Sequence, residues 1–233
     1  MRLLKIGNLA CLLGAALISL PSYASSASDL GLVLNMSNIK QGFEVVSVKE
    51  NSLADKLKVK AGDKIIAIHG QVPSEQNKQG IVAGLNQMQP GDIFNARVVS
   101  DGYEFEVLSI IPKNDKQSNG ESCAYVSLQG VPPKTRDVHR VLVKQVNGRA
   151  VNDISRYKLN TGYNSLSVIE NIRVQDIRYK LNSERRKHVR VYVEPGEQVY
   201  LGAQYLKMRR METLTGRYWY PTIWKSKKVS CSA

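Results

Sequence analysis

A polar stretch, Lys113–Gly120, interrupts the chain without a single apolar side chain. Such a composition cannot add to a hydrophobic core and is typical of a linker. The charge also changes at this point. Residues 25–112 carry 8 basic and 10 acidic side chains, a net charge of −2, whereas residues 113–233 carry 23 and 10, a net charge of +13. The sequence therefore predicts two domains, 25–112 and 123–233, joined by a linker at 113–122.

The N-terminus has the layout of a secretory signal peptide. Two cations precede a mostly apolar run, Ile6–Leu20, and small residues stand before a candidate cleavage site after Ala24. The run of 15 residues is shorter than the about 20 that a membrane-spanning helix requires. We therefore expect residues 1–24 to be a cleaved signal peptide and the mature chain to be periplasmic or secreted, without a transmembrane span. The alternatives are an uncleaved N-terminal anchor and a lipid on Cys11.

Two cysteines, Cys123 and Cys231, remain once the signal peptide is removed. An even pair in an oxidising compartment predicts a disulfide bond. It would close a loop of about 100 residues inside the second domain, which chain-entropy models value at about 4–5 kcal/mol. The alternative is a pair of buried thiols. Neither cysteine has the surroundings of a catalytic nucleophile.

Hydrophobic periodicity and turn residues divide the first domain into strand, helical turn, strand, helix and hairpin. Ile81, Leu85 and Met88 follow the i, i+4, i+7 spacing of one helix face. Asp101–Gly102 between alternating apolar runs is a strong hairpin signal. The expected elements are strands at 42–48 and 64–70, a helical turn at 51–57, a helix at 75–88, and a hairpin of residues 94–98 and 105–109.

Within this order, the segments Asn51–Ala54 and Ala61–Gly70 resemble the core signature of a bacterial-type PDZ domain. Pro90–Asp92 and the Asp101–Gly102 turn stand at the later positions expected of that family. The resemblance covers roughly residues 29–111. It implies an α+β fold, a partly open barrel.

The resemblance also implies a binding site. In PDZ domains an extended peptide adds as a strand, and its C-terminal carboxylate meets backbone N–H groups of a glycine-containing loop. Asp29–Val33 is similar to that loop and the strand after it, and a glycine there leaves the N–H groups unobstructed. The implied peptide-binding residues are Leu30, Gly31, Leu32, Val33, Ile81 and Leu85. The alternative is a groove filled by the chain's own linker or second domain.

Two departures from the family pattern stand out. Leu57–Val59 occupies the place where the family often has Ala-Gly-Leu, so Lys58 is expected to adopt a positive φ that glycine takes more easily. The binding loop also lacks a glycine before Leu30. This second departure weakens the expected capture of a carboxylate.

Short apolar runs and turn residues recur through the second domain. Val189, Val191 and Val193 alternate with polar residues, a pattern that predicts a strand with one buried face. The expected strands are 141–146 and 149–151 around an Asn147–Gly148 turn, 165–169, 189–193 and 199–206, followed by an aromatic edge or core segment at 217–220. This pattern predicts a mainly-β, small sandwich.

The densest basic cluster is Arg185, Arg186, Lys187 and Arg190. We expect these residues to contact an anionic component of the cell envelope. The alternative is a solvated hairpin tip that only aids solubility. Nucleic acid is disfavoured as a partner, because the chain has an export signal and no RNA-binding signature.

Motifs of catalysis were not found in the sequence. It contains no Gly-x-Ser-x-Gly and no His-Glu-x-x-His, and the histidines at 69, 139 and 188 are far apart. We expect no catalytic residues, no metal and no cofactor. The sequence predicts an exported adaptor that binds a protein segment or C-terminus by strand addition, with a basic β-domain facing the envelope or a second partner. The alternatives are a structural cell-envelope protein with an unused groove and a regulator of an exported protease.

Overall fold

A computed structural model describes residues 25–27, 30–113, 123–173 and 186–231. The expected signal peptide, the linker from 114 to 122, Asp29 and Arg185 lie outside these residues. None of the helices in the described residues is both long enough and apolar enough to cross a membrane. We call residues 25–113 the first half and residues 123–231 the second half.

The described residues of the first half form six strands and two short helices. They are β1 (Ser25–Ala27), β2 (Leu32–Asn35), β3 (Phe43–Val48), α1 (Leu53–Lys56), β4 (Lys64–Ile68), α2 (Lys78–Asn86), β5 (Ile93–Ser100) and β6 (Tyr103–Ile110), with the 3-10 helix η1 (Ile39–Gln41). Strand β3 begins at Phe43, one residue later than expected, since Gly42 has a positive φ of 94°. Strands β5 and β6 form the expected hairpin, with positive φ at Asp101 and Gly102. Lys58 has the expected positive φ of 59°.

Two elements are shorter than the sequence predicts. The strand expected at 64–70 ends at Ile68, because His69 and Gly70 both adopt positive φ and turn the chain so that Gln71 pairs with Ile68. The helix expected at 75–88 begins at Lys78, because the Asn77 side chain accepts a hydrogen bond from the Ser74 N–H and holds a turn before the helix.

In the described residues of the second half, the regular structure consists of strands and two 3-10 helices. Its elements are β7 (Ala124–Ser127), β8 (Val138–Val146), β9 (Arg149–Ala150), β10 (Arg156–Leu159), β11 (Gly162–Asn171), β12 (Lys187–Val193), β13 (Glu197–Tyr205) and β14 (Trp219–Lys228), with the 3-10 helices η2 (Lys134–Arg136) and η4 (Lys207–Arg209). The Asn147–Gly148 hairpin forms as expected between β8 and β9. The aromatic segment at 217–220 lies in the core, since Tyr218 and Trp219 are fully buried.

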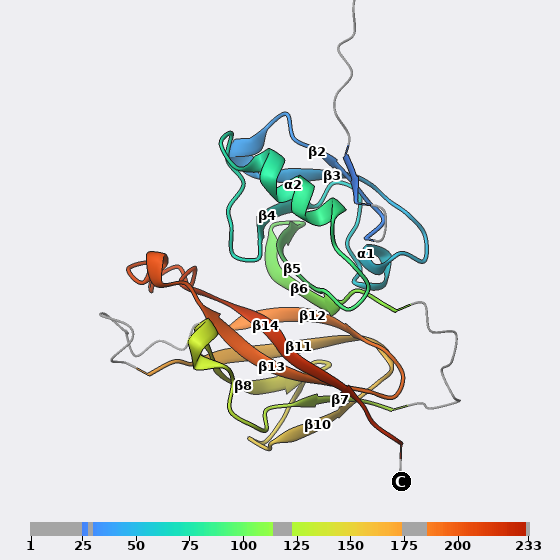
Figure 1. Cartoon of the computed structure of the whole chain (residues 1–233), viewed down its shortest axis with the longest axis vertical. Coiled ribbons are helices and arrows are strands. Elements are labelled where there is room, and N and C mark those ends of the chain that lie inside the picture. The colour runs from blue at the N-terminus through green and yellow to red at the C-terminus, as the bar shows by residue number, and fades with distance from the viewer. Residues whose placement is uncertain (1–24, 28–29, 114–122, 174–185, 232–233) are drawn as a thin grey trace, which may run out of the picture.

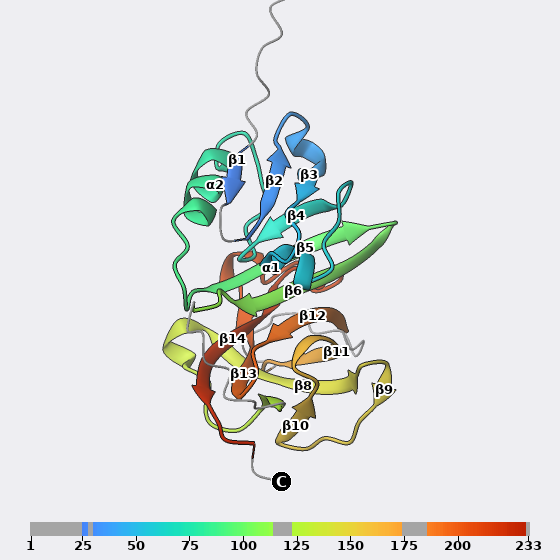
Figure 2. The same cartoon turned by 90° about the vertical axis from the view of Figure 1, so that its right-hand side faces the viewer.

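The sheet is continuous from one half to the other. Its strand order is β1-β2-β3-β4-β5-β6-β12-β11-β8-β13-β7-β10, with β14 on β13 and β9 on β8. The joint is a parallel pairing of β6 with β12, in which Leu108 lies opposite Val191. Figures 1 and 2 both show β5 and β6 at the boundary, above β12 and β14. The expected β-rich fold is confirmed, as one large open sheet that runs through both halves.

Two hydrophobic cores lie along this sheet. The first packs α1 and α2 onto β2–β6 around Phe43, Phe94 and Val107. The second lies among the strands of the second half around Tyr218, Trp219 and Val191, and it includes Leu108 from β6. One strand therefore contributes to both cores. The expected disulfide between Cys123 and Cys231 is present and joins the segment before β7 to the segment after β14.

Candidate peptide-binding groove

The loop that the PDZ resemblance singles out is held against the start of α1. The Leu30 carbonyl accepts a hydrogen bond from the Ala54 N–H at 3.0 Å, and the Gly31 carbonyl accepts one from the Lys49 N–H at 2.8 Å. Gly31 has φ of +71°, and a Cβ at this position would overlap the Cβ of Ser52. Glycine is therefore required here both by the backbone conformation and by the close approach of Ser52.

Four of the six expected peptide-binding residues place their side chains in the first core. Leu30 and Leu32 come from the loop and β2, Ile81 and Leu85 come from α2, and all four are buried. Val33, between them in sequence, faces the opposite side of β2 and is partly exposed. The structure thus brings four of the six expected residues together, as part of the first hydrophobic core.

The edge of β2 that would receive a peptide is paired with the chain itself. Strand β1 runs antiparallel to β2, with Ser25 opposite Leu34 and Ala27 opposite Leu32. Figure 2 shows β1 between β2 and α2, which is where the resemblance places a bound peptide. The internal occupants expected from the sequence were the linker and the second domain. The segment Ser25–Ala27 was missed because three small residues carry no strand periodicity.

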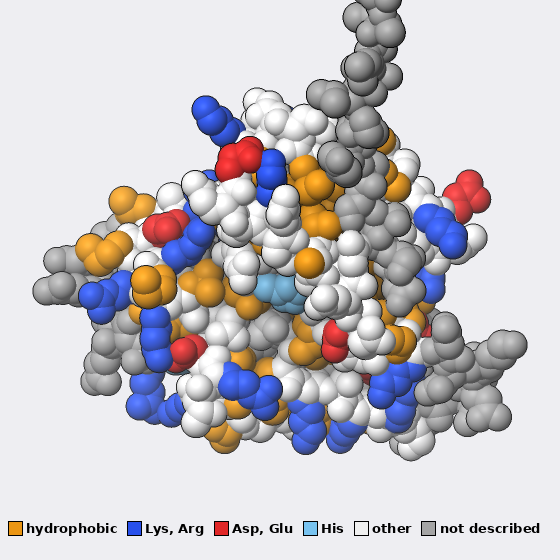
Figure 3. Space-filling view, turned by 45° about the horizontal axis from the view of Figure 1, so that its top comes forward, with side chains coloured by type: hydrophobic (Ala, Val, Ile, Leu, Met, Phe, Trp, Pro, Cys, Tyr) orange, Lys and Arg blue, Asp and Glu red, His pale blue; other side chains and the backbone are white. Residues whose placement is uncertain are grey.

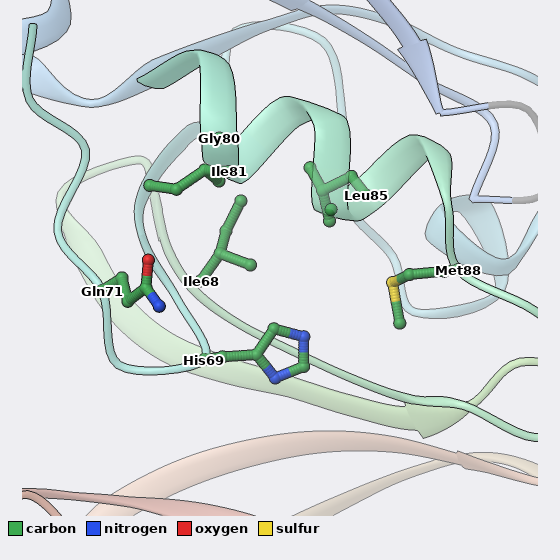
Figure 4. Close-up of a pocket in the computed structure, with 8 residues that line it drawn as sticks. Ile68, His69, Gln71, Gly80, Ile81, Leu85 and Met88 are labelled. Atoms are coloured by element: carbon green, nitrogen blue, oxygen red, sulfur yellow. The ribbon is translucent and has the colours of Figure 1, made fainter. Parts of the chain in front are cut away.

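A separate pocket of about 180 Å³ lies on the β4 side of α2 (Figure 4). Gly80 and Gly84 leave this face of the helix open, since a Cβ on either would meet no atom within 4 Å. Ile81, Leu85 and Met88 line the pocket from α2, and His69 lines it from the turn after β4. The sequence predicted Ile81 and Leu85 for the peptide groove only.

His69 is the one titratable side chain among the residues that line this pocket. Burial lowers the pKa of its imidazole from the ordinary value of 6.5, and the negative charge of Asp92 opposes this shift. Figure 3 shows a histidine near the middle of this face of the molecule. The arrangement places a neutral imidazole beside apolar side chains, and no second nucleophile or acid lines the pocket.

The basic cluster expected from the sequence does not form a single surface. Arg186 is exposed. The Arg190 guanidinium stacks on the Phe105 ring at 3.5 Å and donates to the Lys58 carbonyl at 2.8 Å. Lys187 is turned inward. Arg190 and Lys187 therefore contact both halves, and Arg186 is the one described member of the cluster that is fully exposed.

Lys187 belongs to a buried charge network between the halves. Its Nζ lies 3.2 Å from Oε1 of Glu106, and Nε of Arg97 lies 2.9 Å from the same oxygen. All three side chains are at most 10% exposed. Burial lowers the pKa of Lys187, and the carboxylate of Glu106 opposes that shift. The Lys187 ammonium also lies 5.2 Å from the centre of the Trp219 ring.

Sequence reasoning missed this network, although part of it carries a signal. Arg97 and Glu106 are equidistant from the Asp101–Gly102 turn, so the hairpin register places them directly opposite each other. The contribution of Lys187 could not be read in the same way. It depends on the parallel pairing of β6 with β12, two strands far apart in the chain.

A second crevice, of about 370 Å³, opens between the β5–β6 hairpin and the face of β11 and β12. Tyr103 and Phe105 line one wall, and Tyr163, His188 and Arg190 line the other. Ser167 also lines it, and its hydroxyl is buried without a hydrogen-bond partner in the part of the chain that the structure describes.

No protein-family model and no curated protein matches the chain.

Proposed function

We propose that the protein is an exported adaptor that holds an extended protein segment by strand addition to β2. The observation that supports this proposal is the pairing of β1 with β2. A strand of the chain itself already lies antiparallel on this edge, in the place that the PDZ resemblance implies for a peptide. The disulfide between Cys123 and Cys231 supports an oxidising compartment outside the cytoplasm.

The segment Ser25–Ala27 is a weak occupant of the edge. It pairs over three residues only, and its sequence Ser-Ser-Ala offers little apolar surface. Its advantage is that it belongs to the same chain as β2, which gives it a high effective concentration at the edge of that strand. A ligand with larger apolar side chains and a longer strand would compete by burying more surface and forming more backbone hydrogen bonds.

A screen of C-terminal peptides tests the proposal. Residues 25–233 and a variant that starts at residue 28 would be screened against the same library. We expect the shorter protein to bind a family of peptides more tightly, because the competing strand has been removed. N-methylation of alternate peptide amides is the control, since it blocks strand addition and leaves the side chains unchanged. Absence of binders to both proteins would refute the adaptor function.

The second candidate is a structural envelope protein whose groove serves only its own N-terminal segment. The same pairing of β1 with β2 favours it, because an edge strand closed by its own chain is protected from other strands. Hydrogen exchange at residues 25–27 separates the two functions. Fast exchange of these amides supports the adaptor, whereas protection comparable to that of β3 supports the structural protein.

A further inference from the structure

The loop between β13 and β14 exposes large apolar side chains. Met208 is 98% exposed, Met211 60% and Leu214 63%. The loop itself is anchored, since Thr213 within it and Tyr218 at its base are buried. Its backbone is also ordered by turns such as the one from the Glu212 N–H to the Arg209 carbonyl, at 2.9 Å. The apolar side chains are therefore held outward by a fixed loop, and an exposed apolar cluster of this kind marks an interaction site.

Cations surround these apolar side chains. Lys207, Arg210 and Arg217 of the same loop are exposed, and Glu212 is the only acidic residue between Leu206 and Arg217. In Figure 3, hydrophobic and cationic side chains stand side by side at the left of the molecule, where Figure 1 places this loop.

A second basic segment lies next to the loop. Lys207 pairs with Asp137 at 2.7 Å, and the Gln204 side chain donates to the Arg136 carbonyl at 2.8 Å. These contacts bring η2, with the exposed Lys134 and Arg136, beside η4. The acids Asp137 and Glu212 lie opposite Lys207 and Arg209, so the other cations of both segments give the surface an excess of positive charge.

We propose that the η4 loop, residues 206–217, docks the protein on an anionic lipid surface. Met208, Met211 and Leu214 would enter the boundary between headgroups and acyl chains, and the surrounding cations would contact lipid phosphates. Three flexible side chains on a protruding loop are too few for a specific protein interface, which buries about 800 Å² on each partner. A fluid bilayer needs no complementary pocket. This inference goes beyond the adaptor function, because it does not depend on the groove at β2.

Vesicle sedimentation of residues 25–233 tests the proposal. We expect binding to vesicles of phosphatidylcholine mixed with phosphatidylglycerol, weaker binding to phosphatidylcholine alone, and loss of binding as salt is raised. The triple variant Met208→Ser/Met211→Ser/Leu214→Ser keeps the net charge and should bind at least about tenfold more weakly, since three buried apolar side chains are lost.

The matched control is Val46→Ser/Tyr103→Ser/Ile154→Ser, which removes three similarly exposed apolar side chains elsewhere and should bind like the unaltered protein. Met208→Trp adds a direct readout, because an inserted indole shifts its emission to the blue when vesicles are added. Three results would each overturn the proposal: unchanged vesicle binding by the loop variant, equal loss of binding in both triple variants, or no vesicle binding by the unaltered protein. The last result would leave a protein as the partner of the loop. Peptide binding at β2 is measured without lipid, so the two proposals can fail separately.

Discussion

Gly31 occupies a position that combines a left-handed backbone with a close neighbour. Its φ is +71°, and a Cβ would overlap Ser52, whose hydroxyl cannot move freely because it accepts the Asp55 N–H that caps α1. We expect Gly31→Ala to lower the free energy of unfolding by about 3 kcal/mol, from backbone strain and overpacking together. Urea denaturation measures the change.

Gly62→Ala is the control for this prediction. Gly62 has φ of +89°, and a Cβ there would meet no atom within 4 Å, so only the backbone cost of about 1–2 kcal/mol applies. If both variants lose the same free energy of unfolding, Ser52 does not approach the loop as closely as the structure indicates.

His69 gives the protein a stability that depends on pH. Burial lowers the pKa of His69 in the folded state below the value of 6.5 that it has when unfolded. At pH values between these two pKa values, the unfolded chain binds more protons than the folded chain. The contribution of His69 to stability is therefore complete above pH 6.5 and is lost as the pH falls toward the pKa of the folded state. Chemical denaturation at a series of pH values measures the slope.

The variant His69→Asn should show a flatter pH dependence over this range. Asparagine tolerates the positive φ of 47° at this position, so the turn after β4 is kept. Parallel curves for the two proteins would show that the imidazole remains solvated in the folded state.

At the scale of elements, the buried network of Arg97, Glu106 and Lys187 holds β5, β6 and β12 together. Glu106→Gln leaves two buried cations without their carboxylate, and we expect it to cost about 3–5 kcal/mol. Glu104→Gln is the control. Glu104 contacts the same Arg97 at 3.3 Å, but its side chain is 48% exposed, so its loss should cost less than about 1 kcal/mol. Thermal or urea unfolding compares the two, and similar losses would mean that the network is solvated.

The sequence predicted elements whose signals are local. The Asp101–Gly102 and Asn147–Gly148 turns were found because each forms between neighbouring strands, and a dipeptide with positive φ specifies such a hairpin. The residues that meet around the groove, Leu30, Leu32, Ile81 and Leu85, came from a resemblance to a family.

The pairings missed by the sequence are those that no local pattern encodes. The β6–β12 joint depends on which of several alternating strands reaches the edge of β6, and Val189, Val191 and Val193 suit any partner equally well. The pairing of Ser25–Ala27 with β2 was missed because its residues have neither periodicity nor bulk. A prediction of where each strand begins is therefore easier than a prediction of which strand it joins.

At the scale of the whole molecule, the shared sheet couples the stability of the two halves. The Cys123–Cys231 bond spans 108 residues and lies wholly in the second half, where its removal should cost about 4–5 kcal/mol. Leu108 of β6 packs in the second core, whereas its neighbour Val107 packs in the first core. Unfolding of the second half therefore removes the packing partners of β6 on one side.

We expect Cys123→Ala/Cys231→Ala to accelerate hydrogen exchange in β3 and β4 as well as in β11. Two independent domains would give the opposite result, with exchange in β3 and β4 unchanged, and the β6–β12 pairing would then contribute little to cooperativity. Both tryptophans lie in the second half, so fluorescence reports that half alone and hydrogen exchange is needed to follow the first.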